Sequence, residues 1–131
     1  MNLRKLIAAL LLPALIIGCG PCNVVRAAHA FVVAEAYPYL DTYHWPSPAD
    51  KLKYDKAKKA VDSSYAAFDV ACTTGHVDAA VVLAASAAIA DILDLYGSIH
   101  SGALDATKPD WQVHRDKMRR VQKKAQEVKH G

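Results

Sequence analysis

The segment 76–101 constrains the fold of this 131-residue chain more than any other. Read as a helix, it is apolar on almost every side, and its alanines would let neighbouring helices approach closely. Its longest uncharged run, 79–90, holds twelve residues, whereas a helix needs about 20 apolar residues to cross a bilayer. We therefore expect a buried helix at the centre of a bundle and not a membrane span.

Four groups of helix-breaking residues divide the remainder of the chain. The patterns between them predict helices at about 23–43, 48–72, 76–101 and 109–129, the first of them kinked or interrupted by Pro38. With 53% hydrophobic and 22% charged residues the chain is not disordered. The sequence thus predicts an all-α fold, a small antiparallel four-helix bundle. The breakers are Pro46-Ser47-Pro48, Thr73-Thr74-Gly75, Gly102 and Thr107-Lys108-Pro109.

The second helix has the clearest predicted start. Ser47 can accept a backbone N–H of the first turn, and Pro48 suits the first helical position. Residues at three- and four-residue steps predict its buried face: Tyr54, Ala57, Val61, Ser64 or Tyr65, Phe68, and Ala71 or Cys72. Its opposite side carries lysines, which we interpret as a solvated surface: Lys51, Lys53, Lys56, Lys58 and Lys59.

Charge is segregated along the chain. Residues 60–105 hold six aspartates and no Lys or Arg, whereas residues 106–131 hold eight Lys+Arg and three Asp+Glu. If the fourth helix folds back antiparallel on the third, Asp94 meets Arg115 and Asp91 meets Arg119. We expect docking for the first half of the fourth helix, along a seam that begins with Trp111 and Met118. The half from residue 123 onward should project, offering Lys123, Lys124 and Lys129 to a membrane or partner.

The amino terminus has the pattern of an export signal. Arg4 and Lys5 precede twelve apolar residues, 6–17, which are too few for a permanent span. Leu15-Ile16-Ile17-Gly18-Cys19 resembles the lipobox of bacterial lipoprotein precursors. The resemblance implies diacylation of the Cys19 sulfur, cleavage before it, and acylation of the new amino group. The chain then divides into a signal peptide (1–18), a lipid attachment and tether (19–22) and a helical domain (23–131).

Two other interpretations of this region compete with the lipobox. Cys19-Gly20-Pro21-Cys22 has the spacing of a thioredoxin-like redox motif, but no βαβ pattern follows it. Ala28-His29-Ala30 fits an ordinary signal cleavage site, but it lies far beyond the apolar core. We favour the lipobox over both.

With Cys19 assigned to lipid, Cys22 and Cys72 remain as a pair in an oxidising compartment. A hairpin that turns at residue 47 pairs positions whose numbers add to about 94, and these two cysteines do. The sequence therefore predicts a Cys22–Cys72 disulfide at the open end of the first hairpin. A sharp kink at Pro38 would shift this register.

No pattern in the chain predicts catalysis. The six histidines never lie three or four residues apart, so no helix presents two of them to a metal. Nucleophile elbows, phosphate loops and dinucleotide turns are missing. We therefore expect no catalytic residue, no metal site, no cofactor and no enzymatic activity.

These features predict a lipid-anchored protein of the bacterial cell envelope that acts as a structural or protein-interaction module. The acyl chains on Cys19 would be its contact with the membrane. Its partner would be an envelope protein that the sequence does not identify, and the sequence leaves the oligomeric state open. Nucleic acid is not an expected partner, because the chain is exported and its mature net charge is low. Many inner-membrane lipoproteins resemble one another in having aspartate after the cysteine, so Gly20 favours the outer membrane, facing the periplasm. The alternative is a phage- or plasmid-borne envelope lipoprotein acting in lysis or exclusion.

Overall fold

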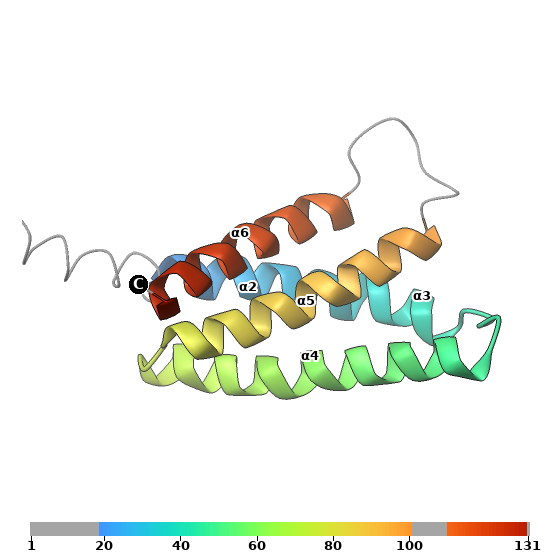
Figure 1. Cartoon of the computed structure of the whole chain (residues 1–131), viewed down its shortest axis with the longest axis horizontal. Helices are drawn as coiled ribbons and strands as arrows, with labels where there is room; N and C mark the ends of the chain where they lie inside the picture. The colour runs from blue at the N-terminus through green and yellow to red at the C-terminus, as the bar shows by residue number, and fades with distance from the viewer. Residues whose placement is uncertain (1–18, 101–109, 131) are drawn as a thin grey trace, which may run out of the picture.

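A computed structural model of the chain describes residues 19–100 and 110–130. Within these ranges the fold is all-α, a helical bundle with four helices and no strand. The first helix comprises α2 (Cys19–Phe31), the π-helical segment η1 (Val32–Ala36) and α3 (Tyr37–Asp41). It is followed by α4 (Pro48–Thr74), α5 (Ala79–His100) and α6 (Asp110–His130), and each helix runs opposite to the one before it (Figure 1). The expected signal peptide, 1–18, lies outside the described residues.

The first helix begins earlier than the sequence pattern predicts. Residues 19–22, which we expected to form a tether, are helical and belong to α2. Pro21 is buried. Within the described residues the first helix therefore already includes Cys19.

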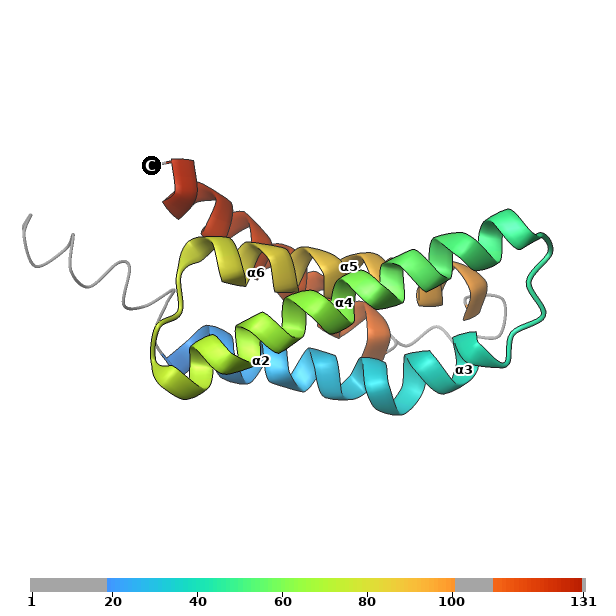
Figure 2. The same ribbon diagram turned by 90° about the horizontal axis from the view of Figure 1, so that it is seen from below.

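Pro38 widens the first helix locally and does not break it. The backbone N–H of Tyr37 bonds to the carbonyl oxygen of Val32, five residues back, which is the π-helical pattern. Such a wide turn absorbs one extra residue and frees the helix from the bond that proline cannot make. The buried positions Val32, Ala36 and Leu40 keep their four-residue steps, and the helix continues past the proline (Figure 2).

The ends of α4 are fixed by local chemistry. The Ser47 Oγ atom accepts the Asp50 backbone N–H at 3.2 Å, as the sequence predicts for this cap. Gly75 ends the helix with φ 77°, a left-handed conformation that favours glycine. The inward side of α4 buries Tyr54, Val61, Phe68 and Ala71, all on the predicted face.

α5 supplies the largest share of the core. It begins at Ala79, three residues later than predicted, because Asp78 Oδ1 accepts the Val81 N–H at 2.9 Å and so caps the helix. By length and composition α5 could cross a membrane, a property that core helices share. Here it is packed among the other helices, and its buried residues include Val82, Ile89, Ile92, Leu93 and Tyr96.

α6 packs chiefly along α5 and also touches α2. Gly97 permits the close approach, because a Cβ atom built at residue 97 would lie 2.3 Å from the Trp111 ring. Met118 and Ala125 are fully buried. The burial of Ala125 corrects our expectation that α6 projects from residue 123 onward. α4 and α6 lie on opposite sides of the bundle (Figures 1 and 2).

Candidate functional site

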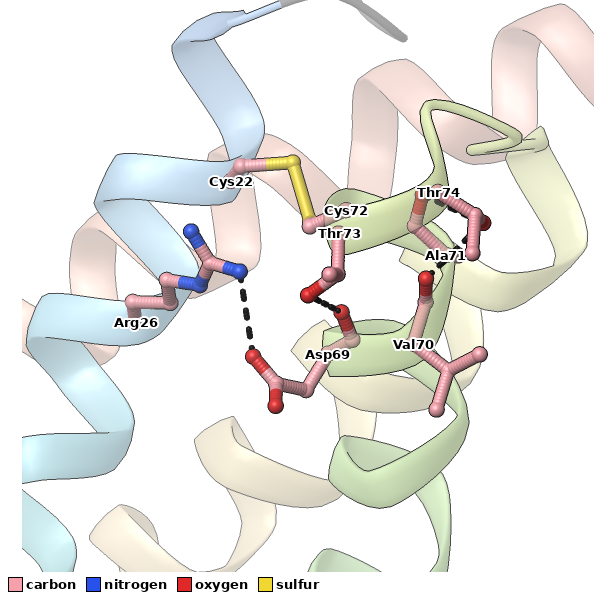
Figure 3. The surroundings of a disulfide bond; sticks show 8 residues. All are labelled: Cys22, Arg26, Asp69, Val70, Ala71, Cys72, Thr73 and Thr74. Atoms are coloured by element: carbon pink, nitrogen blue, oxygen red, sulfur yellow. Dashed lines mark hydrogen bonds and ion pairs between the residues drawn. A yellow bond between two sulfur atoms is a disulfide. The ribbon is translucent and has the colours of Figure 1, made fainter.

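The open end of the first hairpin carries the disulfide (Figure 3). Cys22 of α2 and Cys72 of α4 are joined, with their Cα atoms 6.0 Å apart, and this is the pair that the hairpin register predicts. One turn further along, Arg26 Nη2 lies 3.1 Å from Asp69 Oδ1. The register survives Pro38, because the wide turn at 32–36 replaces a kink.

The predicted ion pairs join α6 to α5. Arg115 Nη1 lies 2.7 Å from Asp94 Oδ1, and Arg119 Nη2 lies 3.0 Å from Asp91 Oδ1 and 2.5 Å from Asp94 Oδ2. The hydrogen bond that Arg115 donates to Asp94 is the main reason that the Arg115 pKa is raised. Desolvation lowers the pKa of Arg119, but the hydrogen bonds that it donates to Asp94 and Asp91, together with the charges of these carboxylates, outweigh desolvation and raise it. Both guanidinium groups are thereby neutralised on the α5 side of α6.

The three lysines that we assigned to a membrane or partner surface do not gather there. Lys123, Lys124 and Lys129 are all exposed. At 100° per residue, however, they are spread over about 100° to 140° from one another around the α6 axis. They therefore form no single patch. Of the three, Lys124 borders a groove together with other cations.

That groove lies between α2 and α6 and has a volume of about 280 Å³. Its lining is Val24 of α2 with Lys117, Arg120, Val121 and Lys124 of α6. The spacing 117, 120, 124 places the three cations on one face of the helix, a signal that the sequence contained. Sequence reasoning missed it, because the groove exists only where Val24 of the other hairpin lies beside that face.

A second hollow, about 230 Å³, lies between the connection 42–47 and the end of α5. Aromatic and apolar side chains dominate its lining, which also includes one aspartate and one lysine. The lining residues are Tyr43, Trp45, Pro46, Asp50, Lys53, Leu95, Ser98 and Ile99. No histidine or cysteine lines it.

Partly buried hydrogen bonds connect the helices of the first hairpin. The Tyr54 hydroxyl donates to Asp41 Oδ1 at 2.5 Å, and the Tyr37 hydroxyl donates to Asp62 Oδ1 at 3.0 Å. Burial and these carboxylates raise the pKa of both tyrosines, while the Tyr54 hydrogen bond lowers the pKa of Asp41. These shifts favour the neutral phenol of both tyrosines and the ionised carboxylate of Asp41.

Two histidines are packed against aromatic rings. His29 stacks on Tyr65 with ring centroids 3.4 Å apart, and His114 lies 5.0 Å from the Phe31 ring. Desolvation lowers the pKa of both imidazoles. Among the described residues no group of three His, Cys, Asp or Glu side chains could hold a metal ion.

Comparison of the chain with protein-family models, with curated proteins and with solved structures found no match.

Proposed function

We propose that the chain is a lipoprotein of the bacterial cell envelope, held in a membrane by acyl chains on Cys19 after loss of residues 1–18. The described bundle is then an antiparallel four-helix module without catalytic chemistry. It acts by presenting its surface to another envelope component, from the periplasmic side of the outer membrane.

The observation that carries this proposal is the Cys22–Cys72 disulfide, three residues after the lipobox cysteine. Disulfides form and persist in oxidising compartments and are rare in the cytosol. The bridge therefore supports export, which the lipobox resemblance also implies. Because Cys19 lies in α2, an acyl group there would hold this end of the bundle close to the membrane surface.

The α4 helix offers a surface for the partner. Lys53, Lys56 and Lys59 point to the outside of α4, and among the described residues none of the three has an ion pair. Two neighbouring lysines differ, because Lys51 pairs with Asp55 and Lys58 pairs with Asp41. A surface with unpaired lysines suits a partner with an acidic patch.

Intact-mass measurement of protein purified from membranes tests the anchor. We expect loss of residues 1–18 and added acyl mass on residue 19, and Cys19→Ser should remain an unprocessed precursor. The matched control is the double variant Cys22→Ala, Cys72→Ala, which should still be processed and acylated. Unmodified Cys19 in the membrane-purified protein would overturn the proposal.

Site-specific crosslinking in intact cells tests the α4 surface. A photocrosslinker at Lys56 should give one discrete adduct, and the variant Lys53→Glu, Lys59→Glu should weaken it. A crosslinker at Ser63, further along the exposed side of α4, serves as the control for random collisions. Adducts of equal strength and variety at both positions would show that the lysines form no specific partner site.

A further inference from the structure

α6 carries cations on two sides that differ in their surroundings. On the α5 side, Arg115 and Arg119 are paired with Asp94 and Asp91. On the α2 side, Lys117, Arg120 and Lys124 line the groove described above, and among the described residues they have no ion pair. α2 itself, from residue 19 to residue 31, contains no carboxylate. The groove is therefore a concentration of uncompensated positive charge with two valines in its wall.

The position of the groove suggests what neutralises this charge. Val24 lies five residues after Cys19 in one continuous helix, or about 8 Å along the axis. The headgroup layer of one leaflet is about 5–8 Å thick. An acyl chain on Cys19 would hold that residue at the membrane surface, so the groove would be held at or next to the lipid headgroups.

We infer that the groove between α2 and α6 binds the phosphate of an anionic phospholipid in the membrane that holds the anchor. Lys117, Arg120 and Lys124 contact the phosphate oxygens, for which the Arg120 guanidinium can donate two parallel hydrogen bonds. Val24 and Val121 contact the first methylenes of the lipid. This inference rests on the proposed function, since it places the groove by the anchor at Cys19.

The contact would also orient the bundle. α6 lies on the opposite side of the bundle from α4 (Figures 1 and 2). A membrane bound at the groove would therefore leave α4, with its exposed lysines, on the side of the aqueous phase. A small cluster of cations binds a membrane only weakly, whereas two or three acyl chains bind it stably. The anchor would supply residence at the membrane and the groove would supply orientation.

The test uses a chain of residues 19–131 carrying Cys19→Ser, which has no acyl group. It contains every described helix and every residue of the described core, so the bundle is retained. Residues 19–131 hold 14 Lys+Arg and 13 Asp+Glu, so net charge gives this chain little attraction to any vesicle. Cosedimentation with phosphatidylcholine vesicles, with and without phosphatidylglycerol, measures the partition coefficient.

We expect binding to the vesicles with phosphatidylglycerol alone, and loss of that binding as salt is raised. Each cation near an anionic surface contributes roughly a factor of five, so the triple variant Lys117→Gln, Arg120→Gln, Lys124→Gln should bind at least about 10-fold more weakly. The matched control Lys53→Gln, Lys56→Gln, Lys59→Gln removes the same charge from α4 and should bind within about two-fold of the parent. Thermal melting verifies that both variants are folded.

Every other result overturns the inference. Equal losses in the two triple variants would mean that overall charge, and not the groove, attracts the chain. Equal binding to both kinds of vesicle, or none to either, would also overturn it. Soluble glycerol phosphate could also compete with the vesicles for the groove. If it binds as tightly as the vesicles do, the ligand of the groove is a free phosphate and not a membrane lipid. Since this chain has no acyl group, these outcomes leave the mass measurement on Cys19 as the separate test of the anchor.

Discussion

The two hairpins of the bundle are held together by different means. In the first, which joins α2–α3 to α4, bonds of several kinds connect the helices: the Cys22–Cys72 disulfide, the Arg26–Asp69 ion pair and the hydrogen bond from Tyr54 to Asp41. In the second, α5 and α6 approach closely at Gly97, and the described ion pairs lie at one edge. The first hairpin therefore depends on specific chemistry, whereas the second depends on shape, and the two should respond differently to the same kinds of change.

The largest expected effect comes from removing the second half of the second hairpin. Truncation after Leu104 deletes α6 and exposes the side of α5 that packs on Trp111 and Met118. Buried side chains of this size contribute about 1.5–3 kcal/mol each, and the whole domain is stable by only about 5–15 kcal/mol. We expect no cooperative melting transition by circular dichroism.

Truncation after Gln122 is the matched control, since it removes Ala125 but keeps Trp111 and Met118. It should lower the melting temperature and leave a cooperative transition. A truncation at Leu104 that melts like the full chain would show that α6 is not part of the stable domain.

Removing the disulfide should have the next largest effect, and it acts on the first hairpin alone. The bridge spans 50 residues, for which the chain-entropy model gives about 4 kcal/mol. The double variant Cys22→Ser, Cys72→Ser should lose about that much unfolding free energy in a urea titration. Reducing agent should destabilise the parent by the same amount and leave the variant unchanged. Two free thiols titrating in unreduced, unfolded parent protein would show that the bridge does not form.

Adding one methyl group at Gly97 should test how strongly the stability of the second hairpin depends on close packing. Gly97→Ala places a Cβ atom against the Trp111 ring, and overpacking of this kind costs about 1–3 kcal/mol. Gly75→Ala is the comparison: nothing lies within 4 Å of its Cβ, and its positive φ costs about 1–2 kcal/mol. Adding Trp111→Leu should relieve the Gly97→Ala defect but not that of Gly75→Ala. Stabilisation by Gly97→Ala, the usual result within a helix, would contradict the close packing.

The smallest expected effect is a dependence of stability on pH. Burial lowers the pKa of His29 and His114 below 6.5, so between pH 6.5 and their folded-state pKa the unfolded chain binds protons that the folded chain does not. The unfolding free energy is therefore highest above pH 6.5 and falls as the pH falls below it. We expect a lower melting temperature at pH 5 than at pH 7.5. The lowered pKa of Asp41 acts only below 3.8, outside this range.

Variants separate the two hairpins here as well. His29→Gln removes the contribution within the first hairpin, where the imidazole stacks on Tyr65. His114→Gln removes the contribution of α6, where the imidazole packs against Phe31. Each should flatten part of the pH dependence. An unchanged slope in both variants would assign the effect to other groups.

The candidate groove shows the limit of reading one helix at a time. The basic character of α6 is evident from the sequence, but the lysines that we first selected are spread around its axis. The cations that share a groove are Lys117, Arg120 and Lys124, and what selects them is Val24, which lies nearly a hundred residues away in the chain. A contact between helices of different hairpins is not encoded in the periodicity of either one.

The sequence by itself determined the features that depend on local or one-dimensional information. Ser47 caps α4 because its oxygen lies next to the N–H groups that need an acceptor. The Cys22–Cys72 and Asp94–Arg115 pairings follow from the position of a turn, because antiparallel helices of equal rise keep residues in step. Residues at three- and four-residue steps identified the buried side of α4, because such steps return to the same side of a helix with 3.6 residues per turn.

Only the tertiary structure decided how the backbone and side chains adjust when these helices meet. The Gly97–Trp111 approach and the burial of Ala125 each depend on what another helix places opposite. Close packing is a three-dimensional condition: the absence of a side chain at residue 97 is favourable only against a particular neighbour. Periodicity indicates which side of a helix is buried. The neighbouring helix determines how closely the two helices approach and which side chains fill the space between them.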